Sequence, residues 1–150
     1  QIINNKPITV TDPNMTRFMM TLGNAVELVM FAFKNGRSGD IFVQKSPSST
    51  IGELALAMKK IYSSKVEIKN IGIRHGEKFH ETLLSKEEKI ISEDLGDYYR
   101  IPADNRDLNY EKYFSKGRKT DELDEFNSNN TIRLTEESLI ELLASIGYKT

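Results

Sequence analysis

The feature that most constrains the fold is the order of apolar patterns, which alternates between strand and helix. The β-branched segment Pro7–Pro13 predicts an extended stretch, and apolar residues at helical spacing predict a helix over residues 22–35. A short apolar run at Asp40–Gln44 then predicts a strand, Thr50 opens a second helix with a capping box, and Val66–Ile73 predicts a further strand. Strands separated by helices are typical of parallel neighbours, so we predict an α/β fold.

The second half of the chain lacks this alternation. Residues 81–94 are charged and predict a helix, whereas residues 96–114 mix aromatic and charged side chains without a clean period. Residues 118–130 are polar enough to be mobile. A last amphipathic helix is predicted, with Thr135 as its cap and Gly147 as its stop.

The composition limits the partners that the chain is expected to have. Its 150 residues include 21 basic and 22 acidic side chains, so no overall attraction to nucleic acid or anionic membranes is expected. Without cysteine it can form neither a disulfide nor a thiolate zinc site. The longest apolar stretch, Ala25–Phe33, is too short for a membrane span, and no export signal is visible. We expect a cytoplasmic protein without nucleic-acid or membrane partners.

Several common catalytic and cofactor motifs are missing. The nine glycines contain no Gly-x-Gly pair, no Walker A sequence occurs, and no tyrosine is followed by a lysine four positions later. His75 and His80 are too few for a histidine-rich zinc site and are predicted to be surface or hydrogen-bonded side chains. We therefore predict no catalytic, cofactor-binding or metal-binding residue in this stretch.

Two arginines are candidates for binding a phosphate or carboxylate. Arg17 follows a proline turn, and Arg74 lies between two glycines at the end of a predicted strand, where ligands of α/β folds tend to bind. If both converged, they would neutralise a diphosphate, with Glu77 accepting hydrogen bonds from sugar hydroxyls. The alternative is that both are ordinary surface arginines, and spacing alone does not decide between the two.

A tyrosine and arginine cluster suggests a different class of function. Tyrosine and arginine are enriched at protein interfaces, and nearby acidic residues cancel the basic charge that nucleic-acid binding needs. A non-catalytic interaction module is therefore the rival hypothesis. In this hypothesis Arg74 is structural, and the binding surface is formed by four members of the cluster, which also includes Arg106. These four are Tyr98, Tyr99, Arg100 and Tyr110.

Beyond these patterns, five segments resemble the later half of bacterial polysaccharide-biosynthesis enzymes that act on nucleotide sugars. These enzymes are extended short-chain dehydrogenase/reductases; they include UDP-N-acetylglucosamine 4,6-dehydratases, some also 5-epimerases, and relatives known as UDP-glucose 4-epimerases. The last two segments are similar to the capsule and O-antigen subgroup. The segments are Pro7–Phe18, Gly39–Lys45, Gly72–Lys78, Gly96–Tyr110 and Asn127–Thr131.

The resemblance implies the C-terminal part of a Rossmann-type enzyme. Residues 1–45 would include elements that complete the Rossmann sheet, residues 46–95 the substrate lid, and residues 96–150 a helical tail with oligomer contacts. The NAD(P)-binding loop and the catalytic residues would lie upstream of Gln1. This fragment alone would therefore bind no NAD(P) and be inactive, and its partners would be the upstream Rossmann half, a UDP-sugar and further copies of the chain.

For the site, the resemblance implies binding roles only. Arg17 and Arg74 would contact the UDP diphosphate, Glu77 a ribose or nearby hydroxyl, and the backbone of Thr9 and Val10 would lie beside the uracil. The implied activity is a UDP-N-acetylglucosamine 4,6-dehydratase/5-epimerase of capsule or O-antigen synthesis. A UDP-glucose 4-epimerase of the same family is the alternative.

The segment Ile41–Val43 carries a prediction about stability. An apolar strand needs neighbours on its edges and cover on both faces, and part of that cover would come from the upstream half. We therefore expect the isolated chain to be less stable than the intact enzyme, or to self-associate.

Overall fold

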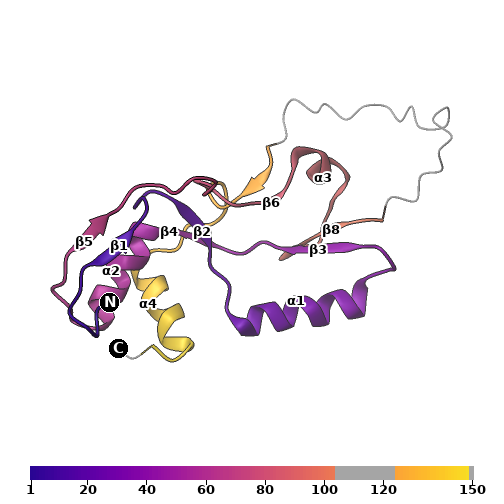
Figure 1. The fold of residues 1–150 in the computed structure, drawn as a ribbon. Helices are drawn as coiled ribbons and strands as arrows, with labels where there is room; N and C mark the ends of the chain where they lie inside the picture. Colours follow the sequence, from indigo (N-terminus) through magenta and orange to yellow (C-terminus); the bar gives the residue numbers. More distant parts are fainter. Residues whose placement is uncertain (104–123, 149–150) are drawn as a thin grey trace. The chain divides into compact units, whose positions relative to one another are not determined.

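The structure is a computed structural model that describes residues 1–103 and 124–148, and it has the mixed α/β class that the sequence predicts (Figure 1). The elements are β1 (Ile8–Val10), β2 (Thr16–Phe18), α1 (Leu22–Asn35), β3 (Ile41–Gln44), β4 (Ser48–Thr50), α2 (Ile51–Ile61), β5 (Ile68–Asn70), β6 (Thr82–Leu84), α3 (Lys86–Ile91), β7 (Glu93–Asp94), β8 (Tyr98–Ile101), β9 (Phe126–Asn127) and α4 (Glu136–Ser145).

Contacts divide the chain into two compact units, and each is assembled from separate stretches of sequence. Unit 1 comprises Gln1–Thr21, Ser46–Glu81 and Ser128–Thr150, and unit 2 comprises Leu22–Lys45 and Thr82–Asn127. The division at residues 45 and 95 that the resemblance implies for the intact enzyme stays a prediction.

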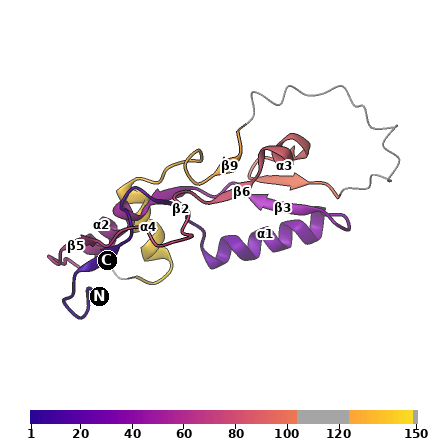
Figure 2. The same cartoon turned by 45° about the horizontal axis from the view of Figure 1, so that its top comes forward.

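Unit 1 consists of two small sheets and a helix pair. β1 pairs with β5 in parallel, and β2 pairs with β4 in antiparallel orientation. Both views show α4 beside α2 (Figures 1 and 2), and their contact is the apolar core formed by Ala57, Leu139 and Leu143. The predicted caps are present: Glu53 closes the capping box of α2 with Thr50, and Thr135 caps α4.

Unit 2 consists of a three-stranded sheet, the helix α1 beside it, and a separate pair of antiparallel strands. The sheet order is β3-β8-β7, and all its pairs are antiparallel, so the expectation of a parallel neighbour for β3 is wrong. β6 pairs with β9. Phe31 of α1 stacks on Tyr98 of β8 with 4.2 Å between the ring centroids.

The apolar face of α1 remains exposed in unit 2. Phe33 is 82% exposed, and on β3 Ile41 is 55% exposed, although the sequence predicted a strand covered on both faces. The predicted bounds of α1 are correct. The other exposed apolar side chains of α1 are Leu22, Val26, Val29 and Met30.

The prediction of one helix over residues 81–94 is wrong. The segment contains β6, α3 and β7, because a capping box between Ser85 and Glu88 starts the helix only at Lys86. The strand predicted over Val66–Ile73 is shorter than expected and ends at Asn70.

None of the helices in the described ranges combines the length and hydropathy that a bilayer-spanning helix needs.

Candidate functional site

The parallel pairing of β1 and β5 brings two distant loops to one edge of unit 1. Ile8 lies opposite Ile68 and Val10 opposite Asn70, so both strands end at the same edge. The N–H of Ile71 then donates to the carbonyl of Val10 at 2.8 Å. The carboxyl ends of parallel strands are where α/β folds bind ligands. The segments that leave this edge are Thr11–Arg17 and Ile71–Glu81, which carry the predicted charged residues.

Glu77 connects these two segments through both oxygens of its carboxylate. Its Oε1 accepts a hydrogen bond from the hydroxyl of Thr11 at 3.3 Å and lies 3.6 Å from Nη2 of Arg17. Its Oε2 accepts from the backbone N–H of Arg74 at 3.3 Å. The carboxylate of Glu77 therefore contacts the guanidinium of Arg17 and the backbone of Arg74, three residues that the sequence singled out separately.

The Arg17 guanidinium is held mainly by backbone carbonyls. Its Nη1 donates to the carbonyl of Thr16 at 2.7 Å, and its Nη2 donates to that of Lys78 at 3.0 Å. Its Nε lies 3.6 Å from the carboxylate of Glu81, which is longer than the about 2.7–2.9 Å of a tight charge-assisted hydrogen bond. The carbonyls therefore fix the position of the group, while its ion pairs are loose.

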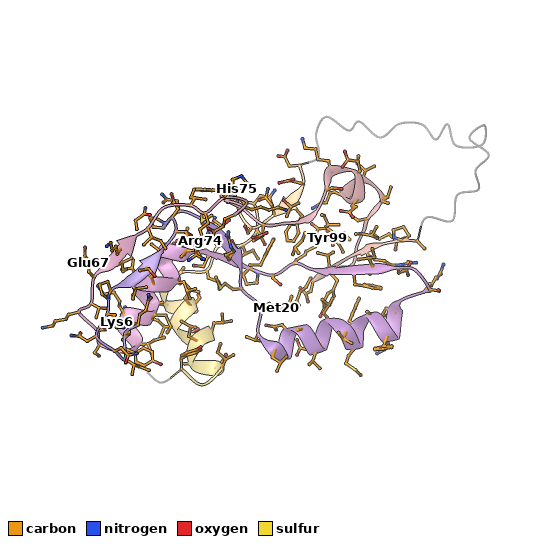
Figure 3. All side chains as sticks on the ribbon, in the orientation of Figure 1. Lys6, Met20, Glu67, Arg74, His75 and Tyr99 are labelled. Atoms are coloured by element: carbon orange, nitrogen blue, oxygen red, sulfur yellow. The ribbon has the colours of Figure 1, made fainter. Side chains whose placement is uncertain are left out.

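Arg74 has its side chain free for a ligand. It is exposed, and within the described part of the chain its guanidinium forms neither a hydrogen bond nor an ion pair. Figure 3 shows Arg74 and His75 on the connection that follows β5. Gly72 and Gly76 flank the two residues with φ of 82° and 81°, a left-handed conformation that favours glycine.

Thr9 and Val10 lie on β1, and the edge of β1 that faces away from β5 is occupied by the side chain of Gln1. Alternate residues of a parallel strand bond to its partner, so the N–H of Thr9 points away from β5. That N–H donates to Oε1 of Gln1 at 3.2 Å, and Nε2 of Gln1 donates to the Thr9 hydroxyl at 2.8 Å. Val10 is buried. A carboxamide therefore occupies the edge where the resemblance implies the uracil.

A cavity of ≈ 370 Å³ lies between β1 and α2 in unit 1. Its wall is apolar except for a few side chains, so it offers few hydrogen-bonding groups to a charged ligand. The side chains that line it include Ile3, Ile8, Val10, Leu54 and Met58.

A buried hydrogen-bond chain beside Arg17 was not foreseen from the sequence. The hydroxyl of Thr16 lies 2.7 Å from Nδ1 of His80 and 2.6 Å from the hydroxyl of Ser128. His80 is thus hydrogen-bonded, in agreement with one of the two roles predicted for it. Ser128 lies in the segment Asn127–Thr131 that resembles the family, but no sequence signal linked it to Thr16, which lies 112 residues away.

The tyrosine and arginine cluster is packed within unit 2. The hydroxyl of Tyr99 accepts a hydrogen bond from Lys89 at 2.8 Å, and Arg100 donates to Asp40 at 2.8 Å and to Glu93 at 2.9 Å. The hydrogen bond from Arg100 holds the pKa of Asp40 below its ordinary value. These side chains form hydrogen bonds within unit 2 and are only partly exposed. The other two members of the cluster, Arg106 and Tyr110, lie outside the described residues.

Comparison with known families identifies the chain. Residues 1–103 match the family described as polysaccharide biosynthesis protein, and residues 104–148 match the family described as polysaccharide biosynthesis protein C-terminal. The chain therefore belongs to the polysaccharide biosynthesis protein family. The resemblance that the five sequence segments indicated is confirmed.

The relatives that this chain matches are longer proteins. A protein of Rickettsia canadensis is 55% identical over 149 residues and one of Rickettsia felis is 54% identical, and both are named UDP-glucose 4-epimerase. Each match covers 99% of this chain and 44% of the relative, so the chain spans less than half of their length. A solved structure of Pen from Bacillus thuringiensis matches 100% of this chain and 43% of its own, with a TM-score of 0.78 and 30% identity.

Proposed function

We propose that this chain is the UDP-sugar-binding part of a longer nucleotide-sugar enzyme of polysaccharide biosynthesis. The observation that carries the proposal is the contact of the Glu77 carboxylate with the Arg17 guanidinium and with the Arg74 backbone, in the segments that follow the carboxyl ends of β1 and β5. Convergent charged groups at such an edge are typical of a phosphate site in an α/β fold. The names of the Rickettsia relatives support a UDP-sugar as the ligand.

The two arginines would bind the diphosphate in different ways. Arg74 is free, so its planar fork of donors can contact phosphate oxygens directly. Arg17 would keep its carbonyl contacts and exchange its loose pairs with Glu77 and Glu81 for phosphate oxygens, since both pairs measure 3.6 Å. Released from Arg17, Glu77 would accept a hydrogen bond from a ribose hydroxyl.

The edge of β1 that faces away from β5 would contact the uracil. The Thr9 N–H and hydroxyl already bind both polar atoms of a carboxamide, that of Gln1. The imide edge of uracil carries the same kinds of donor and acceptor as a carboxamide. Thr9 and Val10 would thus recognise the base through the backbone of β1.

The reaction we propose is sugar 4-epimerisation, with 4,6-dehydration and 5-epimerisation of UDP-N-acetylglucosamine as the second candidate. The names of the relatives favour the first, and the capsule-type segments of the sequence favour the second. This chain would hold the sugar nucleotide in place, and fixed orientation is itself a large part of catalysis.

The helices in the described part of this chain lack the glycine turn that an NAD(P) site of the Rossmann type uses. The longer helices α1, α2 and α4 start after threonines rather than after a Gly-x-Gly turn that brings backbone N–H groups to a pyrophosphate. We propose that the full-length protein binds NAD(P) through sequence outside these 150 residues. The exposed apolar face of α1 supports packing against that part or against a second copy.

Calorimetry with the full-length protein tests the UDP site. We expect Arg74→Ala to weaken UDP about tenfold or more, because a charge-assisted contact to phosphate is lost. The affinity for uridine, which has no phosphate, should stay within about twofold. Arg37→Ala is the matched control, since Arg37 is an exposed arginine of unit 2.

Two outcomes would contradict the proposal. One is a wild-type protein that does not bind UDP, and the other is equal UDP affinity of the wild type and the Arg74 variant. Product analysis with UDP-glucose and UDP-N-acetylglucosamine then separates the two reactions, because only 4-epimerisation returns a sugar of unchanged composition.

A further inference from the structure

The segment that holds Arg17 is itself fixed by buried polar side chains. We propose that Thr16, His80 and Ser128 position the Arg17 guanidinium on the substrate diphosphate through a continuous hydrogen-bond chain. This inference rests on the proposed function, because it assigns a role to residues that would not touch the ligand. They are positioning residues that act through Arg17.

The chain of contacts is short, and it is buried at Thr16 and Ser128 and partly buried at His80. The Thr16 hydroxyl lies 2.7 Å from Nδ1 of His80 and 2.6 Å from the hydroxyl of Ser128. The Ser128 oxygen also accepts from the backbone N–H of Glu81 at 2.9 Å and donates to the Thr16 carbonyl at 3.1 Å. Thr16 is 1% exposed and Ser128 is fully buried. Buried hydroxyls that lose their partners are costly, so this geometry is strongly preferred.

Counting protons assigns the imidazole a role. Each hydroxyl has a single proton to donate. With the Ser128 proton donated to the Thr16 carbonyl, the Ser128 oxygen accepts the proton of the Thr16 hydroxyl. The Thr16 oxygen then accepts from Nδ1 of His80, so this arrangement requires the tautomer that carries a proton on Nδ1. We infer this arrangement, in which His80 is the donor that starts the chain.

The hydrogen-bond chain shares the Thr16 carbonyl with the contacts that hold the Arg17 guanidinium. The Thr16 carbonyl accepts from Nη1 of Arg17 as well as from Ser128, and the Thr16 N–H donates to the carbonyl of Phe79 at 3.1 Å. The neighbouring carbonyl of Lys78 accepts from Nη2 of Arg17. The chain therefore ties β2 to the segment that supplies the acceptors of Arg17.

Removal of one side chain from the hydrogen-bond chain should change the orientation of the Arg17 guanidinium but not its charge. Without the His80 contact, the backbone between Lys78 and Glu81 would retain fewer links to β2. Phe79 and Lys78 are both exposed and supply little packing to replace them. Arg17 would keep its charge but lose its fixed orientation, and a bidentate contact to phosphate depends on orientation.

Paired variants of the full-length protein test the inference by calorimetry with UDP. Thr16→Val and His80→Leu remove the hydrogen-bonding groups, and we expect each to weaken UDP about five- to tenfold. Thr16→Ser keeps the hydroxyl, and His80→Asn places an amide N–H near the position of Nδ1. These two variants should bind UDP within about twofold of the wild type.

Two further measurements separate positioning from general stability. In an Arg17→Lys background, His80→Leu should have no further effect on UDP affinity, because it acts only through the guanidinium. Uridine affinity should be unchanged in all the variants. Nitrogen-15 NMR of the histidine ring should show His80 with its proton on Nδ1. Should Thr16→Val fail to fold, His80→Leu and its Asn counterpart provide the same comparison.

The outcomes distinguish this inference from the proposed function. If Arg17→Lys weakens UDP but Thr16→Val and His80→Leu do not, the positioning role is wrong and the UDP site stands. A His80 ring protonated only on Nε2 would also overturn it. If the wild type does not bind UDP, the proposed function fails, and this inference fails with it.

Discussion

Nη2 of Arg17 lies 3.6 Å from Oε1 of Glu77, so the two charges that the proposed UDP site needs are paired with each other. The side chains are 24% and 29% exposed, so the pair is screened by water and weak. An incoming diphosphate can compete with Glu77 for the guanidinium. If the proposed site is correct, ligand binding would therefore be linked to the release of Glu77.

This competition predicts opposite effects of one variant on two ligands. Glu77→Gln removes the competing charge but keeps an oxygen acceptor, so inorganic pyrophosphate should bind about two- to fivefold more tightly. Uridine should bind less tightly, because the ribose loses a charged acceptor. Calorimetry with both ligands tests this, with the exposed Glu141→Gln as control. Parallel changes for the two ligands would contradict the linkage.

The capping box of α2 predicts a loss of stability. Thr50→Ala removes the side-chain acceptor of the Glu53 N–H and should lower the free energy of unfolding by about 1 kcal/mol. Chemical denaturation of the full-length protein measures the change. Thr50→Ser, which keeps the hydroxyl, is the matched control. Equal stability of the Ala and Ser variants would show that the cap contributes nothing.

Glu53 also predicts how stability depends on pH. Partial burial disfavours its charged form, but hydrogen bonds from Thr50 and Ser49 outweigh burial and hold the pKa of Glu53 below its ordinary value. A lowered folded-state pKa means that its ionised form stabilises the fold above the unfolded value and that this contribution is lost as the pH falls through the folded pKa. Thermal melts should show a smaller acid-induced loss for Glu53→Gln. An unchanged acid profile would refute the assignment.

Asp40 and Arg100 predict an ordering of two variants. The Asp40 side chain is 3% exposed, binds Arg100 at 2.8 Å and accepts the N–H of Arg37, whereas Glu93 is 52% exposed. Asp40→Asn should therefore lower the melting temperature of unit 2 more than Glu93→Gln does. Differential scanning calorimetry compares the two. The reverse order would mean that the exposed pair is the stronger one.

The exposed face of α1 predicts the behaviour of the isolated chain. Phe33, Val29 and Ile41 are 82%, 51% and 55% exposed, so the 150 residues alone should associate in solution. Sedimentation measures the apparent mass, and Phe33→Glu with Val29→Glu should shift it towards the monomer. A monomeric wild-type chain with one cooperative melt would contradict this prediction.

Local signals in the sequence predicted α1, α2 and α4 well, but they failed for residues 81–94 and for the pairing of strands. Thr50, Glu53 and Thr135 act within a few residues of themselves, so the caps and the bounds of α1 followed from spacing alone. The partner of β3 is β8, which lies more than fifty residues away, and an apolar pattern does not say which strand covers it. Strand orientation therefore needed the structure.

The charged residues of the candidate site were predictable from the sequence, but the residues that hold them in position were not. Arg17 and Arg74 stood out because guanidinium groups beside turns suit phosphate, and the resemblance placed them in one site. Ser128 carries no charge and lies in no helical or strand pattern, so its hydrogen bond to Thr16 depends entirely on tertiary structure. Positioning residues of this kind are invisible to spacing arguments.

The interleaving of the two units bears on how the protein is made. Ala57 reaches its core partners Leu139 and Leu143 only near the end of the sequence, and Thr16 must wait for Ser128. During synthesis on the ribosome, unit 1 therefore stays incomplete until residues 128–143 have emerged. A premature stop codon shortly before Ser128 would leave the nascent protein with Arg17, Thr16 and His80 but without the buried hydroxyl that joins them to the rest of unit 1.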